Sequence, residues 1–172
     1  DAHVRREAYV KAFSTRRSEA WLDIWAFGSQ AIDDLLVDVT IRHPMATAYR
    51  PIASRDAGAA AAKAENQKAH RYPPKAGRRV TPFAVESCGR LGAAAEELLQ
   101  MLAAAATSRA RARGQSTTAS AFLRRWRASL DACLLKGIAA SITAYGTVCL
   151  DEHTEKLQAA KLMFPLMWPE IK

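Results

Sequence analysis

The sequence predicts an α/β domain: a small mixed β-sheet, built from a β-hairpin and a further strand, flanked by helices and followed by a helical C-terminal part. Two apolar runs, Leu22 to Phe27 and Leu35 to Ile41, alternate with period 2 across a polar turn, which is typical of a hairpin. An alanine-rich helical segment and a third apolar run follow them. The order strand, strand, helix, strand, helix indicates the α/β class.

Composition indicates a basic domain with one core. The 172 residues carry 25 lysines and arginines against 17 aspartates and glutamates, a net charge of +8, which favours a polyanionic partner such as nucleic acid.

Three cysteines without CxxC spacing and four histidines without metal-ligand spacing support neither a disulfide framework nor a zinc site, and favour a reducing compartment. No signal peptide or membrane-length apolar run is present, so we expect no membrane partner. Because the chain begins at Asp1 rather than Met, we interpret it as a segment of a longer protein.

Each strand of the predicted hairpin carries one carboxylate. Asp23 shares a strand face with Trp25 and Phe27, and Asp38 lies in the middle of the second strand. Charged residues are almost never fully buried unless they are paired or bind a metal, so Asp38 needs a partner. A turn centred near Ala31 places the two aspartates almost opposite each other, within reach of a shared cation. The alternative is an apolar hairpin whose aspartates have no common role.

The segment after the hairpin is predicted to be a helix from Ser54, as N-cap, to Tyr72, where a proline pair ends it. One stripe of this helix is formed by Ala57, Ala61, Ala64, Lys68 and Tyr72. Small residues allow a helix to approach a sheet closely, so Lys68 should project toward the sheet while Lys63 faces solvent. The alternative is that Lys68 extends to the rim or pairs with Glu65 one turn earlier.

The remaining segments complete the predicted organisation. Residues 1–20 are expected to be a basic helical lead-in, 21–108 the α/β core, 117–146 a C-terminal helix and 147–172 a tail. Within the core, 44–51 is expected to be irregular, 78–87 a strand and 91–106 a helix. Six arginines near the C-terminal helix are candidate nucleic-acid contacts, with a solvated face as the alternative: Arg109, Arg111, Arg113, Arg124, Arg125 and Arg127.

Four segments together resemble a known nuclease family. LDIW, VDVTIRHP, ENQKAHRY and VTPFAVESCGRLG are similar to parts of the restriction-like endonuclease domain of site-specific non-LTR retrotransposons, a branch of the PD-(D/E)xK nuclease superfamily. That family has a Pro-Asp, an Asp-Val-Thr strand a dozen or so residues later, and a helix that ends in Lys and Tyr. Fourteen residues lie between Asp23 and Asp38, and the resemblance covers about half of the chain, from Trp21 to Ala106.

The resemblance implies a restriction-endonuclease-like fold and a Mg²⁺-dependent endonuclease that cleaves DNA. It assigns Asp23 and Asp38 as metal ligands. It also assigns four catalytic residues: Asp23, Asp38, Lys68, which has moved from the strand to the helix, and Tyr72 beside it. Thr40 stands at the strand position of the superfamily's usual lysine. The family also implies a reverse transcriptase linked covalently in a longer polypeptide, and a nuclear location in preference to a cytoplasmic one.

The sequence departs from the family at three points. Leu22 replaces the proline of Pro-Asp, no zinc-knuckle cysteines precede the domain, and no reverse-transcriptase motif is present in this segment. The first departure spares the carboxylate that carries the chemistry. The alternative function is therefore a catalytically inactive nuclease-like fold that acts as a nucleic-acid-binding or protein-interaction module.

Overall fold

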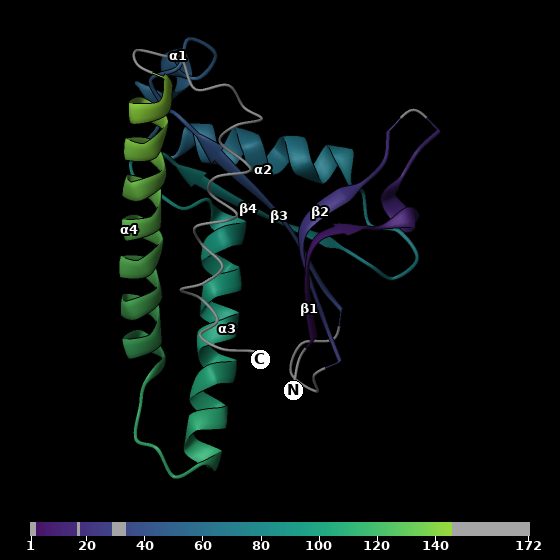
Figure 1. Cartoon of the computed structure of the whole chain (residues 1–172), viewed down its shortest axis with the longest axis vertical. Helices are drawn as coiled ribbons and strands as arrows, with labels where there is room; N and C mark the ends of the chain where they lie inside the picture. The colour runs from purple at the N-terminus through teal and green to yellow at the C-terminus, as the bar shows by residue number, and fades with distance from the viewer. Residues whose placement is uncertain (1–2, 17, 29–33, 146–172) are drawn as a thin grey trace. The chain divides into compact units, whose positions relative to one another are not determined.

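The structure, a computed structural model, describes residues 3–16, 18–28 and 34–145. It combines an open four-stranded mixed sheet with helices (Figure 1), which confirms the predicted α/β class. The sheet order is β1-β2-β3-β4, in which β2 is antiparallel to both β1 and β3, and β4 is parallel to β3. The strands are β1 His3–Tyr9, β2 Trp21–Phe27, β3 Leu35–Arg42 and β4 Val80–Glu86. The helices are η1 Lys11–Phe13, α1 Arg50–Ala53, α2 Ala59–Arg71, α3 Ala93–Ala112 and α4 Ala119–Tyr145.

The predicted hairpin and third strand are confirmed. β2 and β3 pair antiparallel from Ile24 with Val37 to Ala26 with Leu35, while the turn expected near Ala31 lies outside the described residues. β4 joins β3 in parallel through a crossover that contains α2, as two parallel neighbours require. The crossover places α2 against the two strands that carry Asp38 and Glu86.

The helical lead-in predicted for residues 1–20 is wrong, because residues 3–9 form strand β1 at the edge of the sheet. In β1 only Ala8 is buried, and the other side chains are partly or fully exposed. This segment therefore shows little apolar alternation of its own, and its many arginines suit a helix equally well. Pairing with β2, a contact that local sequence does not reveal, decides its conformation.

The helix boundaries also differ from the prediction. α2 begins at Ala59 with Gly58 as its N-cap, not at Ser54, because Gly58 adopts a left-handed φ of 90° that ends any helix entering from the N-terminal side. The short helix α1 occupies part of the connection expected to be irregular. α3 extends to Ala112, six residues beyond its predicted end at Ala106, because alanine and arginine sustain a helix well. α4 agrees with the helix predicted over 117–146, and the tail at 147–172 lies outside the described residues.

The chain divides into two compact units. The first comprises residues 1–86 and 91–95, and therefore holds the whole sheet, α1, α2 and the first residues of α3. The second comprises residues 87–90 and the chain from Glu96 onward, where an ion pair between Glu96 and Arg127 links α3 to α4. Among the described helices, none has the length and apolar character needed to cross a membrane.

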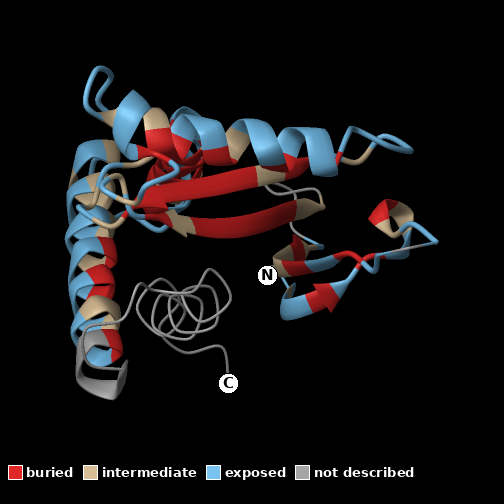
Figure 2. Ribbon diagram, turned by 90° about the horizontal axis from the view of Figure 1, so that it is seen from above, coloured by how far each residue is buried: buried red, intermediate tan, exposed pale blue. Residues whose placement is uncertain are grey.

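Two clusters of buried side chains stand out among the described residues of the first unit. A larger cluster of buried side chains consists of Val10, Phe13, Ala20, Leu22, Leu36, Tyr72 and Val80. A smaller cluster joins Ala61 and Ala64 of α2 to Ala84 of β4, so the predicted stripe of small residues does face the sheet. Figure 2 shows α2 along the sheet, with its exposed surface turned away from the buried strands. Ala57, which was included in the stripe, precedes α2 and is exposed.

Candidate active site

The centre of the site is a buried ion pair between α2 and β3. The Lys68 ammonium lies 2.6 Å from Oδ2 of Asp38, and the two residues are only 6% and 3% exposed. This is the position expected for Lys68 from the alanine stripe, since Ala61 and Ala64 bring α2 close to the sheet. Lys63, on another side of the same helix, is exposed and lies over the ring of Tyr49.

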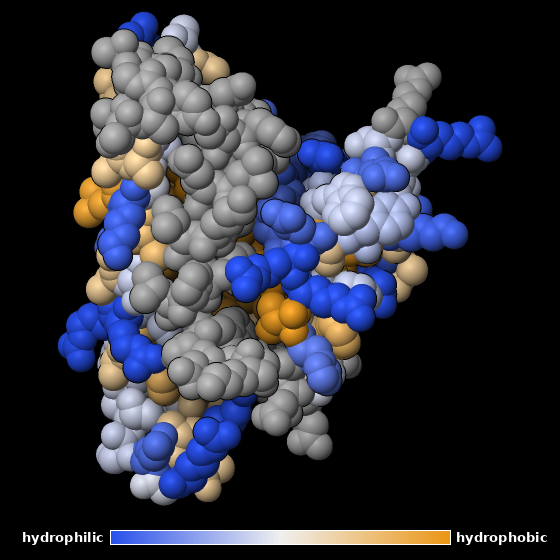
Figure 3. Space-filling view, viewed as in Figure 1, coloured by the Kyte–Doolittle hydropathy of each residue, from blue (hydrophilic) through white to orange (hydrophobic). Residues whose placement is uncertain are grey.

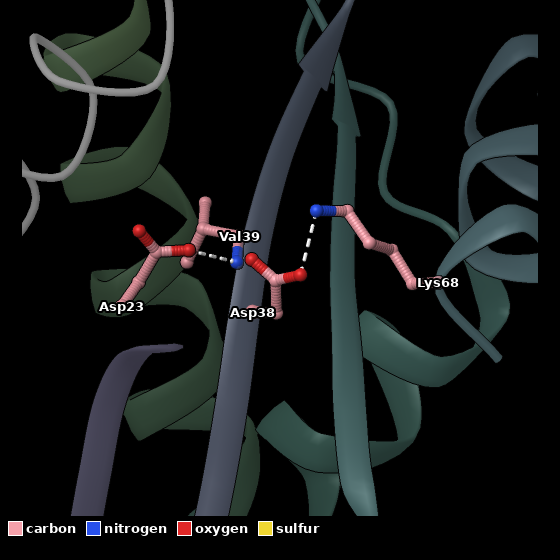
Figure 4. Close-up of polar contacts among 4 residues, drawn as sticks. All are labelled: Asp23, Asp38, Val39 and Lys68. Atoms are coloured by element: carbon pink, nitrogen blue, oxygen red, sulfur yellow. Dashed lines mark hydrogen bonds and ion pairs between the residues drawn. The ribbon is translucent and has the colours of Figure 1, made fainter. Parts of the chain in front are cut away.

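Asp23 completes the site from β2. The β2–β3 ladder ends at the pair of Ile24 and Val37, so the next position along the register would oppose Asp23 to Asp38. There, instead of a backbone pair, the Asp23 carboxylate accepts a hydrogen bond of 2.6 Å from the Val39 amide. Figure 4 shows Asp38 between Asp23 and Lys68, with one carboxylate oxygen turned toward each side. The hairpin thus brings the two aspartates together as the sequence analysis expected.

The environment of Asp23 strongly disfavours its charged form. Burial, followed by a hydrogen bond with Asp38 and the negative charge of Asp38, raises the pKa of Asp23 from 3.8 to about 7. The Val39 amide and the Lys68 ammonium act in the opposite direction, but their effect is smaller. At neutral pH a substantial fraction of Asp23 is therefore protonated, and a cation bound between the two carboxylates would displace that proton.

This raised pKa predicts how the stability of the metal-free protein depends on pH. Because Asp23 holds its proton more tightly in the folded state, its contribution to stability is complete below pH 3.8 and is lost as the pH rises to about 7. Asp23→Asn mimics the protonated carboxyl and does not ionise. The free energy of unfolding of this variant, relative to that of the wild type, should therefore increase between pH 4 and 7. The expected gain is up to about 4 kcal/mol, at about 1.4 kcal/mol per pKa unit.

Urea unfolding of both proteins in EDTA, at pH 5 and pH 8, measures this difference. Asp56, which is exposed and remote from β2 in the sequence, provides the matched control as Asp56→Asn. A constant difference between Asp23→Asn and the wild type at the two pH values would contradict a raised pKa at Asp23.

The end of β4 fixes the N-terminus of α2. Glu86 is 3% exposed, and its carboxylate accepts hydrogen bonds from the amides of Ala60 and Ala61 at 3.2 and 3.4 Å. A negative charge at this position complements the unpaired amides and the positive dipole end of the helix. The contact sets where α2 begins over the sheet, and with it the position of Lys68 further along the helix.

A carboxylate of α2, that of Glu65, binds the start of α3. Glu65 accepts hydrogen bonds from the amides of Ala94 and Ala95 at 3.0 and 3.3 Å. The approach is so close that a Cβ atom added at Gly92 would lie 2.1 Å from Oε1 of Glu65. Glu65 thus positions α2 against the start of α3, while Lys68 pairs with Asp38 on the sheet.

Tyr72 lies in the core beside the site. Its ring is buried in the larger cluster and packs edge-to-face on Phe13 at a centroid distance of 6.1 Å. Burial, with a smaller effect from the charge of Asp38, raises the pKa of the Tyr72 phenol above its ordinary value of 10.0. The phenol is therefore protonated at neutral pH, which suits a hydrogen-bond donor and not a general base.

Thr40 places a buried hydroxyl on the same strand face as Asp38. Its side chain is 1% exposed, and within the described part of the chain its Oγ1 has no hydrogen-bond partner. Residues two apart on a strand project from one face, so this hydroxyl stands next to Asp38 under α2. A buried polar atom without a protein partner is suited to bind a water molecule or a ligand atom.

The donor set fits Mg²⁺ better than a softer metal. Within the described residues there is no group of three or more His, Cys, Asp or Glu side chains that could hold a metal ion, so the site offers the carboxylates of Asp23 and Asp38. Mg²⁺ usually keeps several of its waters and binds through one or two carboxylates together with substrate phosphates. Two adjacent carboxylates supply that number of oxygen ligands, and a bound cation would compete with the proton of Asp23.

The six arginines proposed as nucleic-acid contacts lie in the second unit. All six are exposed on α3, on α4 or in the connection between them. Arg127 forms an ion pair with Glu96. The carboxylates and Lys68 belong to the first unit, so the two sets of residues lie in different units of the chain.

Sequence reasoning missed a cluster of charged and aromatic groups at the other end of β2. Trp25 donates a hydrogen bond from its indole nitrogen to the Asp34 carboxylate, and Arg78 pairs with the same carboxylate at 2.7 Å. The guanidinium groups of Arg78 and Arg5 lie 5.5 and 5.9 Å from the centroid of the Trp25 ring. The sequence of 3–9 carries little signal for this cluster, because the position of Arg5 beside Trp25 depends on the pairing of β1 with β2.

Known proteins give no further constraint on this site. Comparison of the chain with models of protein families, with curated proteins and with solved structures finds no match.

Proposed function

We propose that this chain is a Mg²⁺-dependent endonuclease domain of the restriction-endonuclease-like type, which cleaves phosphodiester bonds in DNA. The observation that carries the proposal is the buried contact between Lys68 and Asp38, at 2.6 Å, with Asp23 on the neighbouring strand. Burying an ammonium and a carboxylate in one pair is often no more stable than apolar packing in the same place, so a function is a reason to retain such a pair. The resemblance of the same segments to retrotransposon nucleases supports DNA as the substrate and a nuclear location, in a longer polypeptide with a reverse transcriptase.

Each residue has a defined part in such a reaction. Asp23 and Asp38 would hold Mg²⁺, which in sites of this kind activates water and neutralises charge on the phosphate. The Lys68 ammonium is fixed by Asp38 on one side of the carboxylates, where it can orient the attacking water or stabilise the negative charge that builds up on the phosphate. Thr40 offers a hydroxyl on the same face. Tyr72 supports the site from the core.

The position of Lys68 on a helix is consistent with the proposal. A lysine on β3 at position 40 would approach the carboxylates along the strand, and Thr40 stands there instead. The ammonium reaches Asp38 from α2, across a layer of alanines. The charged group is thus supplied from a different element to the same place, as the resemblance implied.

The direct test is the nicking of supercoiled plasmid by the purified protein. Mg²⁺ should convert the plasmid to open-circular or linear products, EDTA should prevent this, and Ca²⁺ should support binding without cleavage, because its flexible coordination suits catalysis poorly. The double variant Asp23→Asn/Asp38→Asn, purified in the same way, controls for a contaminating nuclease. Equal nicking by the wild type and this variant would refute the proposal.

A second function, an inactive nuclease-like module that binds nucleic acid or protein, is favoured by one observation. The Lys68–Asp38 pair and the proton on Asp23 already neutralise much of the charge at the site without a metal. In that case the protein should retard DNA fragments in a gel equally with Mg²⁺ and with EDTA, and no nicked product should form under either condition.

A further inference from the structure

A row of aromatic and basic side chains lies on the β1–β2 ladder, and β1 forms an edge of the sheet. The antiparallel register opposes six of these side chains in three pairs: His3 with Phe27, Arg5 with Trp25, and Tyr9 with Trp21. Directly opposed residues in an antiparallel ladder project from the same face. These six residues therefore lie on one face, which we call the aromatic face, with Glu7 and Asp23 between the Arg5–Trp25 and Tyr9–Trp21 pairs.

One end of the aromatic face holds two rings open to solvent. Tyr9 is 43% exposed and Trp21 is 56% exposed, and no other large aromatic residue in the described part of the chain is classed as exposed. Their ring centroids are 5.4 Å apart, and the Trp21 indole nitrogen donates a hydrogen bond of 3.0 Å to Glu19. The Trp21 ring is thus held in a fixed orientation with much of its surface uncovered.

The other end of the aromatic face is cationic. The Arg5 guanidinium lies 5.9 Å from the Trp25 ring centroid and 5.7 Å from that of Phe27, and Arg78 lies 5.5 Å from that of Trp25. Figure 3 shows hydrophilic side chains gathered around paler ones over the part of the first unit that contains β1 and β2. Uncovered rings at one end and arginines at the other match an extended partner that has both flat apolar groups and negative charge, although Arg78 also pairs with Asp34.

We infer that the aromatic face binds an unpaired nucleic-acid strand, whose bases stack on Trp21 and Tyr9 and whose phosphates meet Arg5 and Arg78. Aromatic platforms bordered by cations are the general means of binding single strands, because every base offers a π-face. A duplex keeps its base faces stacked inside the helix, so it cannot offer them to Trp21. The chemistry required, unpaired bases on a phosphate backbone, is common to single-stranded DNA and RNA.

The aromatic face also bears on the candidate active site, and this part of the inference rests on the proposed function. Alternation along β2 places Asp23 on the same strand face, between Trp21 and Trp25. Residues two apart on a strand are separated by about 6.6 Å, so a strand stacked on Trp21 passes directly beside Asp23. The preferred substrate of the site is then a single strand or a duplex with an unpaired flap.

Binding in EDTA tests the inference apart from any cleavage. Fluorescence anisotropy with a labelled single strand of mixed sequence, as DNA and as RNA, and with the matching duplex, gives the three affinities. The wild type should bind at least one single strand more tightly than the duplex, and the tighter strand identifies the natural chemistry. Trp21→Ala should weaken single-strand binding on the order of tenfold, the scale of one lost stacking contact, with little change for the duplex.

Two further variants separate stacking from other effects. Trp21→Phe loses the hydrogen bond to Glu19 but keeps a ring face, so it should retain most of the affinity that Trp21→Ala loses. Met45→Ala removes another exposed apolar side chain, 63% exposed and off the aromatic face, and should bind as the wild type does. Equal affinity for single strand and duplex, or equal losses in Trp21→Ala and Met45→Ala, would overturn the inference. If Trp21→Ala weakens single-strand binding but the wild type does not cleave DNA with Mg²⁺, the inference about the aromatic face is supported and the nuclease proposal fails.

Discussion

Replacing Asp38 by asparagine should abolish Mg²⁺-dependent nicking of supercoiled plasmid. Asp38 is proposed to contact both the metal and Lys68. Its carboxylate holds the Lys68 ammonium at 2.6 Å and lies beside Asp23. The amide keeps the shape of the side chain but removes the charge that would bind the metal and fix the lysine. We expect a loss of at least about a thousandfold in the cleavage rate, since removal of a single preorganised stabilising group already costs a hundredfold to a thousandfold.

Asp38→Asn should also make the protein less stable, and unfolding measurements record this effect apart from the loss of cleavage. Asp38→Asn removes the charge that pairs with the buried ammonium of Lys68, and breaking a buried pair usually costs about 3 to 5 kcal/mol. Loss of the Asp38 charge also removes one cause of the raised pKa of Asp23, so Asp23 should ionise more easily and offset part of this cost. Circular dichroism and urea unfolding should therefore show a folded but less stable protein.

Asp56→Asn is the matched control for nicking, because Asp56 is an exposed aspartate of the same unit. It should cleave at the rate of the wild type. Folded Asp38→Asn protein that nicks plasmid at the wild-type rate would exclude Asp38 from the chemistry. Such a result would leave the buried pair with a purely structural task.

The parts of the site that local patterns determine could be predicted from the sequence. The apolar, β-branched run over 35–41 specifies a buried strand, and β3 is indeed buried on both faces, so the presence of Asp38 within it required a partner. The alanines at 61 and 64 specify a helix that approaches the sheet closely, and helical spacing then directs Lys68 toward that sheet. These predictions succeed because the spacing of side chains along a helix or a strand determines which of them share a face.

Other parts depend on contacts between segments far apart in the sequence, which no local pattern records. β1 was predicted as a helix because its strand character comes from pairing with β2. The bond between Asp23 and the Val39 amide replaces a ladder pair, so its existence depends on where the hairpin register ends. Likewise, no local pattern marks Glu65 or Gly92, because their roles arise only from the contact between α2 and the start of α3.

Replacing Lys68 by alanine is the sharpest test of the nuclease proposal, because acidic pairs bind cations in many unrelated proteins. The ammonium is buried and aimed at Asp38, where it would stabilise charge that develops only during reaction. Lys68→Ala should therefore lower the cleavage rate by two to three orders of magnitude, about 3 to 4 kcal/mol of transition-state stabilisation. The affinity for Mg²⁺ should change little, because the carboxylates remain and a repelling positive charge is lost.

The two quantities are measured separately, the rate from single-turnover cleavage at saturating Mg²⁺ and the metal affinity from the Mg²⁺ dependence of that rate. Lys63→Ala is the matched control, because Lys63 is an exposed lysine of the same helix that lies over Tyr49 and should not affect cleavage. If Lys68→Ala, still folded, loses no more activity than Lys63→Ala, the ammonium has no part in the reaction. The buried pair would then serve only to hold α2 on the sheet, because a charge that acts in the transition state must alter the rate when it is removed.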